Sequence, residues 1–352
     1  MLVSVVLTAA LVLLVDPIVS VMSTPAEAVD GTARYLSVCF IGIPFITAYN
    51  IISSIFRGMG DSKSPMYFIA VACAANIALD YLFMGAMRLG PVGAALGTTL
   101  AQAISVLVAF IAIRRRRSVA VSRADLRPRR DVMGQILGIG MPVALQDGLI
   151  QIAFILITVI ANLRGLTDSA AVGIVEKLIS FLFLVPSSML STVSAIGAQN
   201  IGAGKFSRIR KGIRVAMLSS LGTTLVLEAA VLLFSAPLLD LFTDEPDAKT
   251  YALQMMLYLA PTNWLFIPSD VLGGAIRGAG QAMKVTIISA VCICVFRVIW
   301  LIVTLHFDHN IRYVFLCYPT SWLLSSAAMG IFYFKSAVIR KTLQSQDTAV
   351  PV

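Results

Sequence analysis

Charged side chains are scarce in this sequence. Asp, Glu, Lys and Arg together make up 13% of its 352 residues, whereas 58% are hydrophobic. An ordinary soluble domain carries about 25% charged residues. A chain with half that charge has too few polar groups to cover a surface that faces water, which excludes a soluble globular protein. We therefore predict an all-α polytopic membrane protein.

Histidine and cysteine are also rare, and their positions exclude several kinds of chemistry. The two histidines, His306 and His309, fall in a predicted loop beside Asp308 and Asn310. No predicted membrane helix therefore carries the histidine pair of a metalloprotease or the base of a serine protease, so we expect no enzyme. The cysteines lie in or beside apolar runs without metal-ligand spacing, which predicts packing and no disulfide framework. They are Cys39, Cys73, Cys292, Cys294 and Cys317.

Long apolar runs are what the sequence has in abundance. A bilayer core about 30 Å thick needs about 20 apolar residues per helix, and by this measure we predict ten membrane helices. The first run begins at Met1 without a basic segment before it, so we predict no cleavable signal peptide. The ten predicted spans are 1–22, 34–56, 66–86, 92–113, 135–161, 170–196, 213–238, 250–275, 283–305 and 312–334.

Basic residues orient these helices. Of the 27 Lys and Arg residues, 20 fall on the segments that would share one side of the membrane, and five fall on the other side. This asymmetry marks the cytoplasmic side, so the net charge of +9 reflects topology and headgroup contact, with no nucleic-acid partner. We predict a multi-pass protein of the cytoplasmic (inner) membrane with a cytoplasmic C-terminus. The predicted cytoplasmic segments are 57–65, 114–131, 198–214, 276–284 and 335–352.

The sequence contains an internal repeat. A shift of 220 residues places the apolar run 9–22 over 229–242 with a shared proline, and it places the Arg-Gly-x-Gly of 57–60 over that of 277–280. One ungapped register that links an apolar pattern, a proline and a glycine turn indicates duplication. We therefore predict two homologous helical lobes, related as parallel repeats by an axis along the membrane normal.

The two predicted lobes differ in size. The first occupies 1–117 with four helices, and the second occupies 132–335 with six. A basic cytoplasmic linker, 118–131, joins them, and a cytoplasmic tail, 336–352, follows. Counterparts of the first two helices of the second lobe would lie upstream of Met1. We therefore expect that the chain lacks about ninety N-terminal residues, or two helices, of a twelve-helix protein built as six plus six.

Several segments resemble the multidrug and toxic compound extrusion (MATE) family of antiporters, within the wider superfamily of lipid-linked oligosaccharide and polysaccharide flippases. They follow the family's order from its third helix to its twelfth. The matching segments are RGMGDSKSPM (57–66), NIALDYLF (76–83), GPVGAALGTTLAQ (90–102), GIGMPVALQ (138–146), IGAQNIGAGKFSRIRKG (196–212) and AIRGAGQAM (275–283).

The resemblance implies a mechanism and a set of partners. Two six-helix bundles would rock against each other and export cationic or amphipathic drugs against an inward flow of Na⁺ or H⁺. The expected partners are small-molecule drugs or metabolites and the lipid bilayer, with no cofactor besides the coupling ion, and we expect a monomer. The family's cation sites that use an acid of the first helix have no matching residue here.

Ionisable residues inside the predicted helices are the candidates for cation or proton coupling and for the substrate cavity, because a central Asp or Arg costs about 2.5–3.5 kcal/mol to insert. Asp147 follows the helix-breaking Pro142, beside Gln146 and one turn before Gln151. These oxygens suit a hard cation or a proton; a polar helix–helix contact is the alternative. The other candidates are Glu176, Asp80, Asn76, Asp270, Asn50, Glu228 and Arg297.

For several of these residues a structural role stays open. Asp80, with Asn76 one turn earlier, lies near the outer end of its predicted helix, where a cap is the alternative. Arg297 equally suits a bridge between helices through backbone carbonyls. Glu176 precedes Lys177, and neighbours in sequence point apart on a helix, so the two need not pair.

The glycine turns are predicted to be structural. Asp61 follows Gly58-Met59-Gly60 in a run that resembles the motif of intramembrane aspartyl proteases, but the repeat places Gln281 there and keeps the arginine and glycines. Glycine supplies the positive φ that a tight turn needs, so we interpret the run as a connector. The residues assigned to structural loops are Arg57, Gly58, Gly60, Arg277, Gly278, Gly280, Gln199, Asn200 and Gly202.

Other functions stay open beside drug efflux. A flippase of a lipid-linked saccharide would need a basic cavity for a diphosphate, whereas the predicted helices carry five candidate acids against two bases, which favours cationic substrates. A non-functional truncated transporter would follow if the expected loss of two helices opens the first lobe to lipid. The sequence decides neither the substrate nor the choice between Na⁺ and H⁺.

Overall fold

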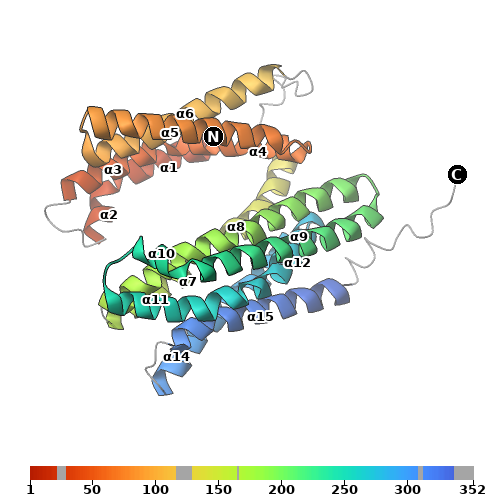
Figure 1. The fold of residues 1–352 in the computed structure, drawn as a ribbon. Helices are drawn as coiled ribbons and strands as arrows, with labels where there is room; N and C mark the ends of the chain where they lie inside the picture. Colours follow the sequence, from red (N-terminus) through yellow and green to blue (C-terminus); the bar gives the residue numbers. More distant parts are fainter. Residues whose placement is uncertain (22–28, 116–128, 165, 308–311, 337–352) are drawn as a thin grey trace. The chain divides into compact units, whose positions relative to one another are not determined.

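The computed structural model describes residues 1–21, 29–115, 129–164, 166–307 and 312–336, and every regular element in these ranges is helical. The chain divides into two compact units, unit 1 (Met1–Arg127) and unit 2 (Pro128–Val352). Figure 1 shows the helices of each unit running side by side along its length. Most of the predicted linker and nearly all of the predicted tail lie outside the described residues.

Unit 1 is built from six α-helices and a short π-helical segment among its described residues. Each predicted span corresponds to one helix or to two helices in succession. The elements are α1 (Leu2–Leu13), α2 (Val15–Val21), α3 (Val29–Ile41), α4 (Ile43–Gly58), α5 (Lys63–Asp80), the π-helical η1 (Tyr81–Ala86) and α6 (Gly90–Arg115).

Unit 2 is larger, and its first two helices are the longest in the described chain. Both run through an internal proline, Pro142 in one and Pro186 in the other. The elements are α7 (Arg130–Arg164), α8 (Leu166–Gly202), α9 (Phe206–Leu233), α10 (Ser235–Asp240), α11 (Pro246–Leu259), the 3₁₀-helical η2 (Ala260–Phe266), α12 (Ile267–Gly278), α13 (Ala282–Ser289), the π-helical η3 (Ala290–Val295), α14 (Phe296–Phe307) and α15 (Arg312–Lys335).

The fold is that of a polytopic helical membrane protein, as predicted. Eight helical segments of the described chain are long and apolar enough to cross a membrane. Two of the ten predicted spans are not among them, and both consist of shorter elements. Span 1–22 divides into α1 and α2, and span 250–275 divides into α11, η2 and α12.

The break between α1 and α2 has a counterpart in the second copy of the repeat, between α9 and α10. Leu14 ends α1 with φ −97° and ψ 8°, and Phe234, 220 residues later, ends α9 with φ −101° and ψ 21°. Pro17 and Pro237 then fall in the first turns of α2 and α10. A proline lacks the N–H that an inner helical position donates and is tolerated in a first turn. The shared proline therefore accounts for the shared break.

The two Arg-Gly-x-Gly turns have the same backbone hydrogen bonds. The N–H of Gly60 and of Gly280 donates to the arginine carbonyl three residues earlier, at 3.0 and 2.9 Å. The N–H of Asp61 and of Gln281 donates to the carbonyl five residues earlier, at 2.9 and 3.1 Å. Both glycines have positive φ, +86° and +79°. This helix-ending geometry satisfies the last carbonyls of α4 and α12, and the two turns are alike in structure as well as in sequence.

Asp61 caps the start of the following helix, α5. Its carboxylate accepts hydrogen bonds from the Ser64 backbone N–H at 3.0 Å and from the Ser64 hydroxyl at 2.7 Å. A carboxylate in this position satisfies an otherwise unpaired N–H of the first turn of α5. Asp61 is a capping residue at the end of the turn.

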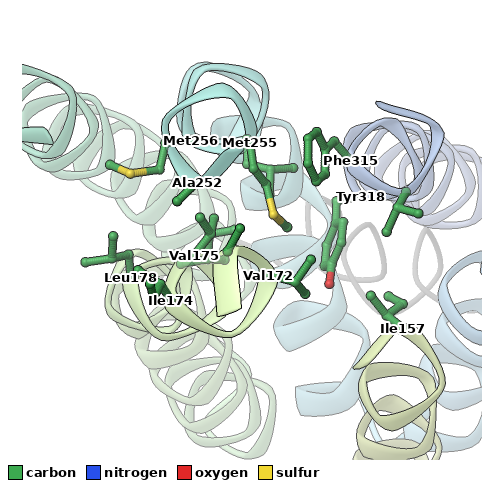
Figure 2. Close-up of a cluster of buried hydrophobic side chains, with 14 of the residues drawn as sticks. Ile157, Val172, Ile174, Val175, Leu178, Ala252, Met255, Met256, Phe315 and Tyr318 are labelled. Carbon is green, nitrogen blue, oxygen red and sulfur yellow. The ribbon is translucent and has the colours of Figure 1, made fainter. Parts of the chain in front are cut away.

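The main core lies in unit 2, where α7, α8, α11 and α15 meet. Figure 2 shows Phe315 and Tyr318 of α15 facing Met255 of α11 and Val172 of α8. A second cluster joins α8, α9, α12 and α13 around Val271 and Ile276. The buried cluster of unit 1 is smaller and contains Tyr49, Phe56, Phe68 and Ala109.

The second predicted connector lies elsewhere than expected. Gln199, Asn200 and Gly202 belong to the last turns of α8, and the turn itself follows at residues 203–205. The Asn200 side-chain amide donates to the Ile196 carbonyl at 2.8 Å, one turn earlier on the same helix. The apolar run predicted an end of this helix at residue 196, whereas α8 continues through the polar residues to Gly202, because hydropathy marks the apolar region and not the helix end.

Candidate functional site

A polar cluster joins three helices of unit 2. The Arg277 guanidinium, at the end of α12, donates to the Gln146 side-chain oxygen on α7 at 2.9 Å. The Thr286 hydroxyl on α13 donates to the carbonyl of Pro142 at 2.8 Å and lies 3.5 Å from the same Gln146 oxygen. Pro142 has no N–H to donate to the carbonyl four residues earlier, and its own carbonyl accepts a hydrogen bond from another helix through Thr286. The predicted helix-breaking site is therefore a hydrogen-bonded junction.

Two carboxylates lie close to this junction. Asp147 and Asp270 are both near enough to the Arg277 guanidinium to stabilise its charge. Asp270 is buried, with 9% of its surface exposed, whereas Asp147 is exposed. In the described chain neither makes a direct ion pair with Arg277. The structure thus brings together Gln146, Asp147 and Asp270, and it adds Arg277, which the sequence had placed in a structural turn.

A second polar cluster surrounds Arg297 inside the core of unit 2. The Arg297 Nε donates to the Ser321 hydroxyl at 3.0 Å, and its guanidinium lies 4.6 Å from the centre of the Tyr318 ring. The Tyr318 hydroxyl donates to the Glu176 carboxylate at 3.0 Å. Arg297 therefore links α14 to α15, and Tyr318 links α15 to Glu176 on α8. Lys177 points away and is exposed, as expected for a helical neighbour.

Asp80 and Asn76 lie together in unit 1. The Asn76 amide donates to the Asp80 carboxylate at 3.3 Å, one helical turn apart on α5. Gly97 of α6 packs so closely that a Cβ placed there would collide with the Asp80 carboxylate. Asp80 also lines a concavity of about 600 Å³ with Ile77. Asp80 lies at the end of α5, just before η1, and its side chain makes no capping hydrogen bond there.

Asn50 and Gln151 are not brought into these clusters by contacts within their own units. Both are exposed, and the Asn50 amide donates to the Ile46 carbonyl of its own helix at 3.0 Å. Asn50 is the repeat counterpart of the buried Asp270, so the two copies differ in burial at this position.

Glu228 is the most deeply buried of the candidate carboxylates, with 4% of its surface exposed. Three further polar residues of α9 and η2 are fully buried but did not stand out in the sequence: Ser220 and Thr224 on α9 and Asn263 in η2. The spacing of Ser220, Thr224 and Glu228, four residues apart each time, would have indicated a single polar face on α9.

These features define a class of protein: a polytopic helical membrane protein of two repeated units, with charged and amide side chains held inside its helix bundle. The particular family follows from the comparisons. The family model MatE matches residues 1–82 and 142–303, and the chain therefore belongs to the MATE family.

Several similar curated proteins are named for multidrug resistance or export. "Probable multidrug resistance protein YpnP" of Bacillus subtilis is 30% identical over 280 residues, which cover 78% of this chain and 62% of the relative. "Probable multidrug resistance protein YoeA" of the same species is 27% identical, covering 90% and 70%. "Multidrug export protein MepA" of Staphylococcus haemolyticus is 25% identical, covering 78% and 61%. The chain thus spans less than two thirds of the length of YpnP.

Solved structures give the same fold. "Crystal structure of MATE in the bent conformation" describes a chain that matches with a TM-score of 0.89 and 20% identity, covering 97% of this chain and 77% of that one. A transporter from Pyrococcus furiosus, described as having a "reverse polarity of binding pocket", matches with a TM-score of 0.90 and the same identity and coverage.

Proposed function

We propose that the protein exports cationic or amphipathic small molecules across the cytoplasmic membrane, driven by an inward flow of Na⁺ or H⁺. Membership of the MATE family and the names of the curated relatives support the proposal. We further propose that the protein works as a monomer with a cytoplasmic C-terminus, with lobes at 1–117 and 132–335 that alternate access between the two sides of the membrane.

The observation that carries the proposal is the set of carboxylates inside the helices of unit 2. Asp270 and Glu228 are buried, Glu176 is half-buried, and none of the three forms a direct ion pair in the described chain. An intramembrane carboxylate is costly and marks an ion or substrate pathway by default. Such carboxylates attract a coupling ion or a cationic substrate. In an exchanger, binding of the substrate releases the coupling ion, and binding of the ion releases the substrate.

The direct test is transport by the purified chain. In proteoliposomes, ethidium movement is measured with an imposed Na⁺ gradient, with an imposed proton gradient and with neither. We expect ethidium exchange that depends on one of the two gradients. Equal ethidium movement under all three conditions, in liposomes that contain correctly folded protein, would contradict coupled export.

Asp147 gives the first residue-specific prediction. It lies beside Gln146, which is bonded to Arg277, so loss of its charge changes the electrostatics of the junction without removing a packed side chain. We expect Asp147→Asn to reduce gradient-driven ethidium efflux severalfold at unchanged membrane expression. Asp131→Asn is the matched control, because Asp131 is exposed at the start of the same helix and, among the described residues, pairs with Arg129 at 3.2 Å. Efflux equal to that of the control would remove Asp147 from the coupling site.

A flippase of a lipid-linked saccharide is the second candidate. The observation in its favour is that the Arg277 Nε and one terminal nitrogen of Arg297 are buried without a hydrogen-bond partner in the described chain. Buried guanidinium groups suit a phosphate ligand. Translocation of a fluorescent saccharide linked to a lipid diphosphate, in proteoliposomes that do not move ethidium, would favour this function over drug export.

A further inference from the structure

One face of α9 carries buried polar groups that lack partners. Ser220, Thr224 and Glu228 follow at intervals of four residues, and each has a buried side-chain oxygen without a hydrogen-bond partner in the described chain. Serine and threonine in a helix commonly donate to the carbonyl four residues earlier. The adjacent Ser219 and Thr223 do so, at 2.7 and 2.8 Å. The buried face therefore differs from its exposed neighbours in leaving its oxygens free.

A buried amide stands opposite this face. Asn263 lies in the 3₁₀ segment η2, is fully buried, and has no hydrogen-bond partner for its side-chain oxygen or its nitrogen. Its side chain and the Trp264 backbone N–H lie close to the Glu228 carboxylate, near enough to stabilise a negative charge there. The packing of η2 on α9 thus collects a carboxylate, a hydroxyl and an amide from two elements.

Of the buried carboxylates described in unit 2, Glu228 is the one without a positively charged side chain near it. Asp270 is attracted electrostatically to the Arg277 guanidinium, and Glu176 is attracted to that of Arg297. No lysine or arginine of the described chain interacts with Glu228. A buried polar group without a hydrogen-bond partner destabilises the folded state, and a buried unpaired charge does so more strongly. Several such groups in one place therefore indicate a bound partner that carries a positive charge.

We propose that Thr224, Glu228 and Asn263 form a binding site for a monovalent cation of the size of Na⁺. Their free atoms include a carboxylate, a hydroxyl and an amide oxygen, which are the hard ligands that such an ion takes. A proton would satisfy the carboxylate alone and would leave the Thr224 and Asn263 oxygens without a partner. Ser220 extends the polar face one turn further along α9.

A Na⁺ site would supply the coupling ion of the proposed export. Its role in coupling rests on the proposed function, whereas the binding of Na⁺ can be tested without it. The binding test therefore needs no transport. The thermal unfolding midpoint of the purified full chain is measured in detergent as NaCl replaces choline chloride at constant ionic strength. A ligand that binds the folded state alone raises the midpoint with its concentration, so we expect a saturable rise with Na⁺.

Two adjacent threonines supply a matched pair of variants. Thr224→Val removes the buried hydroxyl and should weaken the apparent Na⁺ affinity by roughly tenfold. Thr223→Val removes an exposed hydroxyl that bonds its own helix and should leave the affinity unchanged. Glu228→Gln should abolish the saturable rise, and Thr224→Val keeps the test decisive if the glutamine variant does not fold.

Three results would overturn the site. One is a midpoint that does not distinguish Na⁺ from choline. Another is an equal loss of Na⁺ affinity in Thr223→Val and Thr224→Val. The third is a midpoint that depends on pH but not on Na⁺ and loses that dependence in Glu228→Gln, which would make Glu228 a proton site. Saturable Na⁺ binding without ethidium transport would support the site while contradicting the proposed export.

Discussion

Tyr318 joins two charged side chains inside the core of unit 2. Its hydroxyl donates to Glu176 at 3.0 Å, and its ring receives the Arg297 guanidinium at 4.6 Å. Removing the hydroxyl should leave the stacking intact and deprive the Glu176 carboxylate of its donor. Since hydrogen bonds inside membrane bundles are worth about 0.6–1.7 kcal/mol, we expect Tyr318→Phe to destabilise the protein by about 1 kcal/mol.

The measurement is the thermal unfolding midpoint of Tyr318→Phe in detergent, compared with that of the unmodified protein. Tyr258→Phe serves as the control, because the Tyr258 ring packs on Phe315 and its hydroxyl makes no hydrogen bond with a described residue. An unfolding midpoint of Tyr318→Phe equal to that of the control would show that the Glu176 contact contributes nothing to stability.

The residues of the candidate site could be predicted only in part, because hydropathy finds a polar group inside a helix but not what it faces. Gln146, Asp147, Asp270 and Glu228 stood out for this reason. Arg277 was assigned to a cytoplasmic turn by its local motif, yet its guanidinium reaches Gln146, 131 residues away in sequence. The partner follows from the packing of α13, the helix after the Arg277 turn, against α7, and no local pattern encodes that packing.

At the scale of single elements, α12 packs on α8 through two glycines one helical turn apart. A Cβ on Gly274 would lie 2.5 Å from the Leu190 carbonyl oxygen, and one on Gly278 would lie 2.7 Å from the Ser194 carbonyl oxygen. Small residues four apart let two membrane helices approach at backbone distance. An added methyl must push the helices apart, so we expect Gly278→Ala to destabilise unit 2 by about 1–3 kcal/mol.

The repeat provides the control for this prediction. Gly58 is the counterpart of Gly278, ends the equivalent helix, and has open space where a Cβ would lie. Among the described helices of unit 1, none packs on Gly58 as α8 packs on Gly278. Gly58→Ala should therefore leave the thermal unfolding midpoint nearly unchanged, and a loss as large as that of Gly278→Ala would show that the cost arises from the turn and not from the helix contact.

Helix positions followed from the sequence more readily than helix ends. Apolar length sets where a helix must cross the bilayer, and the helical elements fall on the predicted spans. The break at Leu14 and the 3₁₀ segment η2 escaped prediction, because the hydropathy of both runs is continuous while the backbone is interrupted beside prolines. The interruption matters for the candidate cation site, since η2 is the segment that directs Asn263 toward α9.

At the scale of the whole molecule, the same offset of 220 residues relates helix breaks, turns and charge. Both Arg-Gly-x-Gly turns would lie on the basic, cytoplasmic side, yet the two arginines differ in their contacts. Arg57 donates to the Ser54 hydroxyl of its own helix at 3.0 Å, whereas Arg277 reaches across to α7. The repeated turn thus contributes an arginine to the polar junction with α7 in unit 2, whereas the described contact of the matching arginine in unit 1 lies within its own helix.

The predicted orientation of that framework can be tested on intact cells. Arg208 is exposed at the start of α9, on the predicted cytoplasmic side, and Asp244 is exposed in the turn before α11, on the opposite side. In a background without native cysteines, an impermeant maleimide should label Asp244→Cys in intact cells and label Arg208→Cys only after permeabilisation. Since the excess of Lys and Arg sets orientation, the reverse labelling pattern would invert the whole topology and place the C-terminus outside.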